Sequence, residues 1–311
     1  MSVISGELIK QLRESSGAGI LDCKKALTES QGDMEAATDW LRKKGLASAA
    51  KKASRVAAEG LVGVYTKGNK GYLLEINSET DFVARNEQFQ KFVSSLLTLA
   101  YEKSITNIDA LKELTFPGTS HNVAEELSRN VATIGENLSL RRIQMLSVSQ
   151  GVVAGYVHNA VVPGLGKIGT LIALESTGNT EKLAALGKSL AMHVAAATPK
   201  SLQVSDLPQD VVAREKDVLM EQIKDSGKPQ EIIDKMIDGK LRKFYQDVVL
   251  LEQTYVIDGE SRISDLLKKS EKEVGAPVKL TAFDRFMLGE GIEKVQSDFS
   301  AEVAAQAGLS K

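Results

Sequence analysis

The sequence predicts an α+β protein in which a small helical module precedes a core of two related subdomains, each an antiparallel sheet with a helix. Three observations predict this class. Apolar residues recur with helical spacing near the start of the chain. The period changes from 3.6 to 2 at residue 61. A strand–turn–strand–helix layout then occurs twice, which indicates an internal duplication.

Composition fits a globular protein: of 311 residues, 42% are apolar and 26% are charged. The net charge of −2 gives no global attraction to nucleic acid or anionic membranes. A single cysteine, Cys23, excludes an intrachain disulfide and fits a reducing compartment. The sequence starts without a signal-peptide pattern, and no apolar run approaches the ~20 residues that cross a bilayer. We therefore expect a cytoplasmic protein with no membrane partner.

The N-terminal part has the pattern of three short helices separated by glycine corners. Ser5 is the expected cap of the first helix, and Gly17 its expected end. Asp22 is the expected cap of the second helix, and the third is expected to end at Gly45. Residues 46–56 are alanine-rich and basic, which predicts a solvated helical connector. An RNA-contacting stripe is the alternative, and the lack of interleaved aromatic residues disfavours it.

The first core subdomain is expected over 56–148. Its helix from about Asn86 has apolar residues at i, i+3, i+4, i+7, i+8 and i+11, a strong amphipathic pattern. The other elements, in chain order, are strands 61–65 and 72–76 around a glycine turn at 67–71, a helix over 123–134 and a strand over 138–148.

The second core subdomain, 149–288, repeats this layout roughly 95 residues later. Leu74-Glu75 and Leu174-Glu175 are expected to end corresponding strands. Residues 206–247 depart from the repeat and predict an inserted helical hairpin, whose polar content favours a protruding arm. The remaining elements are strands 152–157 and 169–175, a helix ending before Pro199, a helix over 264–270, a strand over 277–288, and a C-terminal module, 289–311, with a helix from about Asp298.

The sequence contains no strong motif for nucleotide binding, metal binding or catalysis. Residues 164–169 match G-x-G-x-x-G, but a strand follows the match, so a hairpin turn is predicted and no nucleotide site. The histidines, His121, His158 and His193, lack metal-ligand spacing, and His193 on an apolar helix face is expected to be structural. We therefore expect no metal, no cofactor and no catalytic residue. An enzyme with carboxylates assembled in space stays open as an alternative.

The loop over 78–85 connects a predicted strand to the strongest predicted helix. Phe82 and Val83 are apolar and precede the expected cap at Asn86. One interpretation is that both side chains pack under the helix as a hydrophobic staple. The other is that they form an apolar plug, next to a carboxylate, that is presented to a partner.

Several long stretches, in order, resemble the bacterial elongation factor Ts family. They are LRESSGAGILDCKKAL at 12–27, ETDFVAR at 79–85, IGEN at 134–137 followed by Arg141-Arg142, AMHVAA at 191–196, SGKP at 226–229 and GEGIEKV at 289–295. Together they cover nearly the whole chain. The resemblance implies a guanine-nucleotide exchange factor, not an enzyme, that binds the GTPase elongation factor Tu in its GDP-bound and nucleotide-free forms. It implies no nucleotide binding by the chain itself and no requirement for RNA.

The resemblance also implies domains and contacts. Residues 1–55 would be a ubiquitin-associated-like module with its connector. The segment inserted near the magnesium site of the GTPase would be Thr80, Asp81, Phe82 and Val83. Further partner contacts would be Ile20, Leu21 and Lys24 in the N-terminal module and Ile134, Gly135 and His158 in the core. From the pattern alone, Ile20 and Leu21 would be buried in their own module, and His158 would be a surface residue at a strand end.

Overall fold

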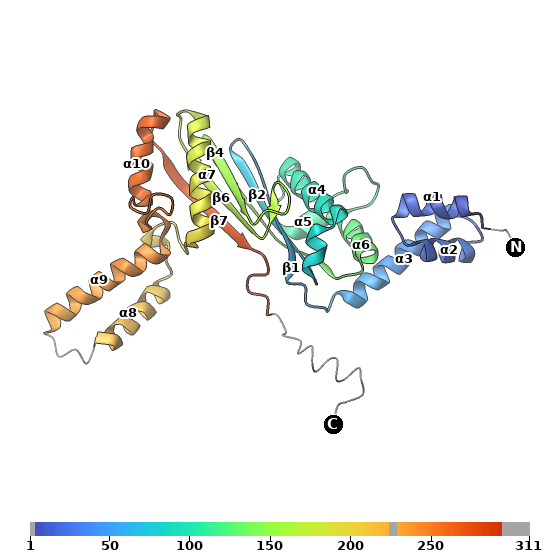
Figure 1. Cartoon of the computed structure of the whole chain (residues 1–311), viewed down its shortest axis with the longest axis horizontal. Coiled ribbons are helices and arrows are strands. Elements are labelled where there is room, and N and C mark those ends of the chain that lie inside the picture. Colours follow the sequence, from blue (N-terminus) through green and yellow to red (C-terminus); the bar gives the residue numbers. More distant parts are fainter. Residues whose placement is uncertain (1–3, 224–228, 294–311) are drawn as a thin grey trace, which may run out of the picture.

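The computed structural model describes residues 4–223 and 229–293. The molecule is elongated, with the N-terminal helices at one end and a pair of long helices at the other (Figure 1). Ten α-helices and two antiparallel sheets in these ranges agree with the predicted α+β class. No helix within these ranges combines the length and the apolar character that a membrane span requires.

The N-terminal module contains α1 (Gly6–Ser16), α2 (Ile20–Glu29) and the start of α3 (Met34–Lys52). Ser5 caps α1 as predicted, because its Oγ accepts the Leu8 N–H at 3.2 Å. Gly17 ends α1 with a left-handed φ of 68°. The helices enclose a small core of Leu12, Cys23, Ala26, Leu27 and Ala37.

Two expected boundaries in this module are wrong. Asp22 does not cap α2, because that helix begins at Ile20 after Gly19 and Asp22 lies in its first turn. Helix α3 does not end at Gly45 but continues to Lys52. The alanines after Gly45 favour helix. A Cβ at position 45 would lie 3.6 Å from that of Ala132, so this glycine faces α6 (Val123–Ile134). The predicted helical connector is therefore the last part of α3.

The first sheet has the strand order β3-β2-β1-β5. A two-residue turn at Gly68-Asn69 joins β1 to β2, as the glycine pattern predicts. Helix α4 begins after the predicted cap Asn86, whose Oδ1 accepts the Phe89 N–H at 3.1 Å. The elements are β1 (Glu59–Lys67), β2 (Lys70–Ser78), β3 (Leu138–Ser147), β5 (Leu165–Gly166), α4 (Glu87–Lys103), α6, and the unpredicted α5 (Ile108–Glu113).

The second sheet has the order β4-β6-β7. Residues 164–169 include β5, which pairs with β1, and the start of the strand at 168–175, so the prediction that a strand follows this stretch is confirmed. Helix α10 is longer at both ends than the predicted 264–270. The elements are β4 (Gly151–His158), β6 (Ile168–Glu175), β7 (Lys279–Met287), α7 (Thr180–Ala197) and α10 (Ile263–Val274).

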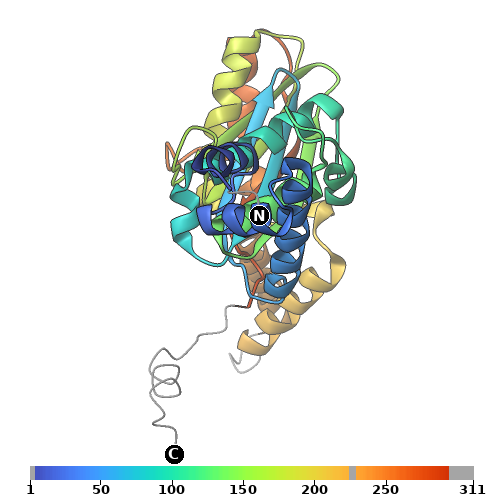
Figure 2. The same cartoon turned by 90° about the vertical axis from the view of Figure 1, so that its right-hand side faces the viewer.

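The two sheets pack face to face, and each outer face is covered by helices, α7 on one side and α4 on the other (Figure 1). Seen from the N-terminal end, the first helices lie in front of both sheets (Figure 2). On β2, Leu73 packs in the cluster between the sheets, whereas Leu74 packs in the cluster that contains α4. The side chains of a strand alternate between faces, so coverage on both sides explains why β2 is buried along nearly its whole length.

The halves share a glycine with positive φ at the same place in each pair of strands, which fixes how they correspond. Gly60 and Gly151 have φ of 121° and 138°, and an added Cβ would lie 2.2 Å and 2.0 Å from the carbonyl oxygens of Ile76 and Leu174. Ile76 therefore corresponds to Leu174. The expected match of Leu74-Glu75 with Leu174-Glu175 is wrong by two residues, because it relied on sequence similarity rather than on the strand pairing opposite these glycines.

The arm at the far end is a pair of helices, α8 (Gln209–Ile223) and α9 (Gln230–Val248), that pack against each other (Figure 1). The short 3₁₀ segments Val204–Asp206 and Leu250–Glu252 flank it. The inserted helices predicted at 206–247 are therefore present and project from the second sheet. Of the turn predicted at 226–229, residues 226–228 lie outside the described residues, as does the predicted C-terminal helix.

Candidate functional site

The loop after β2 is a short, tightly hydrogen-bonded turn. Asp81–Arg85 forms a 3₁₀ helix that leads directly into α4. Ser78 Oγ donates to the Thr80 carbonyl at 2.9 Å, and the Asn86 N–H donates to the Val83 carbonyl at 3.0 Å. Both ends of the segment are thus fixed by local bonds.

The two apolar residues of this loop have opposite environments. The Phe82 side chain is 75% exposed, and Asp81 beside it is also exposed. Val83 and Ala84 are buried in the core that contains α4. The staple interpretation is therefore right for Val83 and wrong for Phe82, which presents an unpaired aromatic ring to solvent. Isolated apolar residues are common on surfaces, but a ring next to a carboxylate on a fixed turn can enter an apolar crevice beside a polar site.

A second segment holds this loop from the side. Glu136 follows the end of α6, and its carboxylate accepts the Thr80 N–H at 2.9 Å and the Thr80 hydroxyl at 2.5 Å. The Asn137 N–H donates to Glu79 Oε1 at 2.5 Å. These contacts place Ile134 and Gly135 beside the Thr80–Val83 segment. Ile134 is half-buried against the core, whereas Gly135 is exposed and ends α6 in a left-handed conformation.

The candidate residues of α2 form a separate surface. Ile20 and Leu21 are 59% and 78% exposed, and Lys24 is exposed one turn later. The interpretation that Ile20 and Leu21 are buried in their own module is therefore wrong. Cys23 and Ala26 occupy the buried side instead. This surface lies on the module that projects beyond α6 (Figure 1), whereas Phe82 lies in the segment between β2 and α4.

The histidines occupy different settings. His158 is exposed at the end of β4, where its Nδ1 lies 3.2 Å from the Tyr156 hydroxyl. His193 is fully buried on α7; its Nε2 contacts Gln253 Oε1 at 3.0 Å and its Nδ1 accepts the Val256 N–H. Burial lowers the pKa of His193, against the opposing hydrogen bond to Gln253. His193 is thus a structural residue, as predicted.

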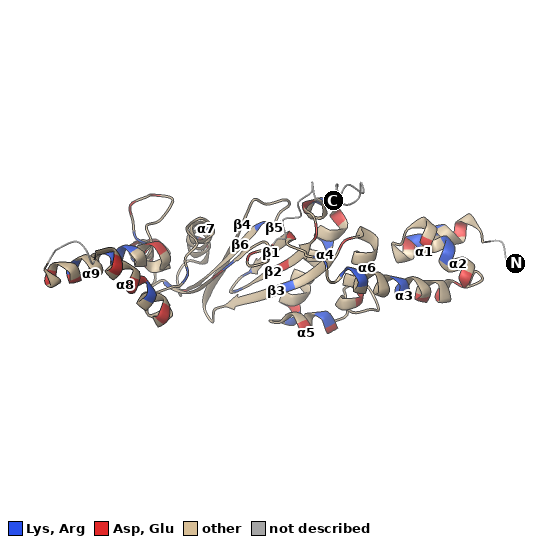
Figure 3. Cartoon of the chain, turned by 90° about the horizontal axis from the view of Figure 1, so that it is seen from below, with Lys and Arg blue, Asp and Glu red and all other residues tan. Residues whose placement is uncertain are grey.

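The basic stretch at the end of α3 is partly neutralised. Lys44 pairs with Asp22 and Arg42 pairs with Glu125, while Arg55 Nη1 lies 3.3 Å from Glu79 Oε1. Figure 3 shows charges of both signs interspersed along the helices, including the α8–α9 arm. The described residues contain no group of three His, Cys, Asp or Glu side chains that could hold a metal ion.

Sequence reasoning missed two residues. Glu136 lies within a recognised motif, but its contact with Thr80 could not be read from the sequence. Glu75 is fully buried, and its signal was a charged residue in the apolar strand at 72–76. Among buried side chains a carboxylate is uncommon and requires partners.

A family model described as "Elongation factor TS" matches residues 79–290. Similar curated proteins carry the name Elongation factor Ts. The one from Paramagnetospirillum magneticum is 59% identical over 308 residues, covering 99% of this chain and 98% of the relative. The relative from Rhodospirillum centenum is 58% identical over 308 residues, covering 99% of this chain and 100% of the relative. The relative from Sphingopyxis alaskensis is 55% identical over 309 residues, covering 99% of this chain and 100% of the relative.

Proposed function

The chain belongs to the elongation factor Ts family, and from this premise we propose that its Thr80–Val83 segment drives GDP release from elongation factor Tu. Membership makes the chain a nucleotide exchange factor for that GTPase in translation elongation, rather than a catalyst of a chemical reaction. The observation that carries the proposal is the exposed Phe82 ring next to Asp81, on a turn fixed from both ends and from Glu136.

The proposed mechanism acts on the nucleotide site of the partner. GDP and Mg²⁺ are held there by backbone amides and an ordered metal shell. Insertion of the Phe82 ring into an apolar crevice would separate the helices that support this shell. Asp81 would compete for the hydrogen bonds that hold the waters of the metal. Loss of Mg²⁺ removes the main neutralisation of the diphosphate, and GDP then dissociates.

Nucleotide binding and factor binding to the GTPase are thermodynamically linked. If the factor lowers the affinity of the GTPase for nucleotide, nucleotide lowers its affinity for the factor by the same coupling free energy. The chain therefore binds the GDP-bound form, stabilises the nucleotide-free form and is displaced when GTP binds. In this scheme the chain binds no nucleotide itself, needs no RNA and works in the cytoplasm.

The other contacts would supply affinity and orientation. Ile20, Leu21 and Lys24 form an exposed apolar and basic surface suited to a complementary helix on the partner. Ile134 and Gly135 directly precede Glu136, which bonds Thr80, so they would contact the partner next to the inserted ring. His158, exposed at the end of β4, would extend the contact to the second sheet.

We also propose a division of the chain into four parts. They are a ubiquitin-associated-like module with its connector at 1–55, a first core subdomain at 56–148, a second at 149–288 with the hairpin 206–247 inserted, and a C-terminal module at 289–311. The three-helix arrangement of α1–α3 and the matching positive-φ glycines of the two sheets, Gly60 and Gly151, support this division.

The test is the release rate of a fluorescent GDP from elongation factor Tu, with and without this protein. We expect strong acceleration by the wild type, and a loss of tenfold or more, as an order of magnitude, in Phe82→Ala and Asp81→Ala. Ile257→Ala is a matched control, since Ile257 is 56% exposed but lies on the loop before α10. No acceleration by the folded wild type would overturn the exchange function. Acceleration unaffected by both substitutions would overturn the role of the loop.

A further inference from the structure

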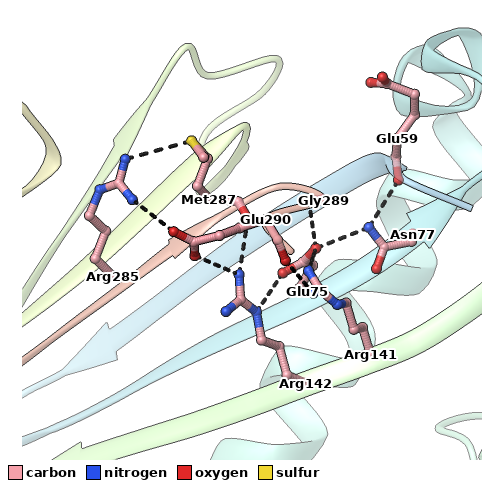
Figure 4. Close-up of polar contacts among 9 residues, drawn as sticks. All are labelled: Glu59, Glu75, Asn77, Arg141, Arg142, Arg285, Met287, Gly289 and Glu290. Carbon is pink, nitrogen blue, oxygen red and sulfur yellow. Dashed lines mark hydrogen bonds and ion pairs between the residues drawn. The ribbon is translucent and has the colours of Figure 1, made fainter. Parts of the chain in front are cut away.

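A fully buried carboxylate, Glu75, lies at the centre of a polar cluster between the sheets (Figure 4). Its Oε1 accepts from Arg141 Nη1 at 2.9 Å, from Asn77 Nδ2 at 3.0 Å and from the Gly289 N–H at 2.8 Å. Its Oε2 accepts from Arg142 Nε at 2.6 Å. Burial alone raises the pKa of Glu75, but these four donors together hold it below its ordinary value, so the carboxylate is ionised.

The cluster fastens the chain that leaves the second sheet to the first sheet. Arg142 Nη2 donates to the Met287 carbonyl at 3.0 Å and contacts Glu290 Oε2 at 3.4 Å. Arg141 Nη2 donates to the Glu290 carbonyl. Gly289 has a φ of 71°, and a Cβ there would lie 2.3 Å from the Ala58 carbonyl oxygen, so the turn at 287–290 lies directly against the start of the first sheet.

Comparison of the two halves indicates that the fold does not need this cluster. Glu75 pairs with Arg142 across β2 and β3, just before the register shift of that pair of strands. At the corresponding place before the shift in the second sheet, Ala173 pairs with Ala282. The same strand pairing thus forms with two alanines. The buried ion pair is an addition in the first half, and buried ion pairs are weak contributors to stability compared with apolar packing.

The location of the addition is informative. β2 continues from Glu75 through Asn77 to Ser78, where the loop with Thr80 and Phe82 begins. β3 begins just after Glu136, the residue that holds Thr80. The cluster therefore joins the two strands that support the Phe82 loop, and adds a third support, the turn at 287–290.

We propose that Glu75 is a positioning residue for nucleotide exchange, whose clamp on Arg141, Arg142 and the Gly289 N–H makes the base of the Phe82 loop rigid. The inference rests on the proposed function. A ring that separates two packed helices must push against a support that does not yield, because any give at its base reduces the displacement at its tip. Glu75 touches neither the partner nor the nucleotide, and acts through Phe82.

The test combines Glu75→Gln with Phe82→Ala in the fluorescent GDP release assay, over a range of factor concentrations. The amide keeps the size of the side chain and removes the charge. We expect Glu75→Gln to lower the maximal release rate by about tenfold and to leave the half-saturating concentration within about threefold of wild type. In the Phe82→Ala background, the same substitution changes the rate less than about twofold, because residues that act as one unit are not additive.

The opposite results overturn the proposal. Two results would show that Glu75 does not act through the loop. One is an unchanged maximal GDP release rate in Glu75→Gln. The other is that Glu75→Gln lowers this rate by the same factor in the wild-type and in the Phe82→Ala background. Thermal unfolding establishes that each variant is folded. If Glu75→Gln does not fold, Arg142→Lys carries the same test, since it keeps a positive charge near Glu75 and removes the donor to the Met287 carbonyl. Glu175→Gln, on the return strand of the second sheet, is the control that keeps the wild-type rate. Absence of acceleration by the wild type would instead overturn the exchange function.

Discussion

Phe82 and Val83 are adjacent in the sequence, but Phe82 faces solvent and Val83 faces the core: Phe82 is 75% exposed and Val83 is 4% exposed. A 3₁₀ helix has three residues per turn, so consecutive side chains point in well-separated directions. Val83 therefore anchors the loop to the core under α4, while Phe82 is free to contact a partner. Val83 therefore contributes to the stability of the loop, and Phe82 to its contact with the partner.

Substitutions at these neighbours are expected to have opposite effects. Val83→Ala removes buried methyl groups and should lower the free energy of unfolding by about 2 kcal/mol. Phe82→Ala should leave the melting temperature nearly unchanged and slow GDP release. Denaturant unfolding and the release assay on both variants check this. Equal loss of stability in both would contradict the assignment of Val83 as the anchor.

The hydrogen bond between the Thr80 hydroxyl and Glu136 can be tested by removing the hydroxyl. Thr80→Val keeps the shape of the side chain and removes the donor of the 2.5 Å contact with Glu136. We expect it to lower the maximal rate of GDP release several-fold, because the loop loses one of its fixed points. Thr80→Ser, which retains the hydroxyl, should keep most of the rate. If the valine and serine variants behave alike, the hydroxyl does not position the loop.

The exposed surface of α2 should affect affinity rather than the release step. Leu21 is 78% exposed, so Leu21→Ser should leave the melting temperature unchanged. Because this surface lies apart from Phe82, the substitution should raise the half-saturating factor concentration without lowering the maximal release rate. Leu27→Ser is the contrasting variant, since Leu27 is fully buried and its loss should unfold the module. A lower maximal rate in Leu21→Ser would contradict this division of roles.

Asp284 should make stability depend on pH. Burial raises the pKa of Asp284 to about 6, against a lowering hydrogen bond from Gln144. The folded state therefore favours the protonated acid. Its stabilising contribution is fully present below the ordinary pKa of 3.8, is lost as pH rises through about 6, and is absent at pH 7 and above.

Asp284→Asn is neutral at every pH and should unfold at a higher temperature than wild type at pH 7.5, with the difference shrinking toward pH 4. Thermal unfolding across this range measures it. Asp217→Asn, which removes an exposed carboxylate on α8, is the surface control. A constant difference between Asp284→Asn and wild type at all pH values would show that ionisation of Asp284 is not its cause.

Local signals predicted most elements well. Ser5, Asn86 and Gly17 mark helix ends that the structure confirms, because a cap depends on residues within one turn. The predicted helix over 123–134 matches α6 at both ends. Asp22 and Gly45 were misread, because a favourable cap residue or a glycine is outweighed when neighbouring residues and packing favour a continuing helix.

The sequence by itself determined the α+β class, the order of most of the elements, the inserted arm and the family motifs that point to the Thr80–Val83 loop. These depend on periodicity and on long motifs, which are local along the chain. Only the tertiary structure decided that Phe82 faces solvent while Val83 is buried, and that Glu136 holds Thr80. It alone joined Glu75 to Gly289, 214 residues later in the chain. The Thr80–Glu136 contact depends on the pairing of β2 with β3, and the Glu75–Gly289 contact depends on how the two sheets pack face to face. Burial of a polar group becomes visible only when its distant partners are in place.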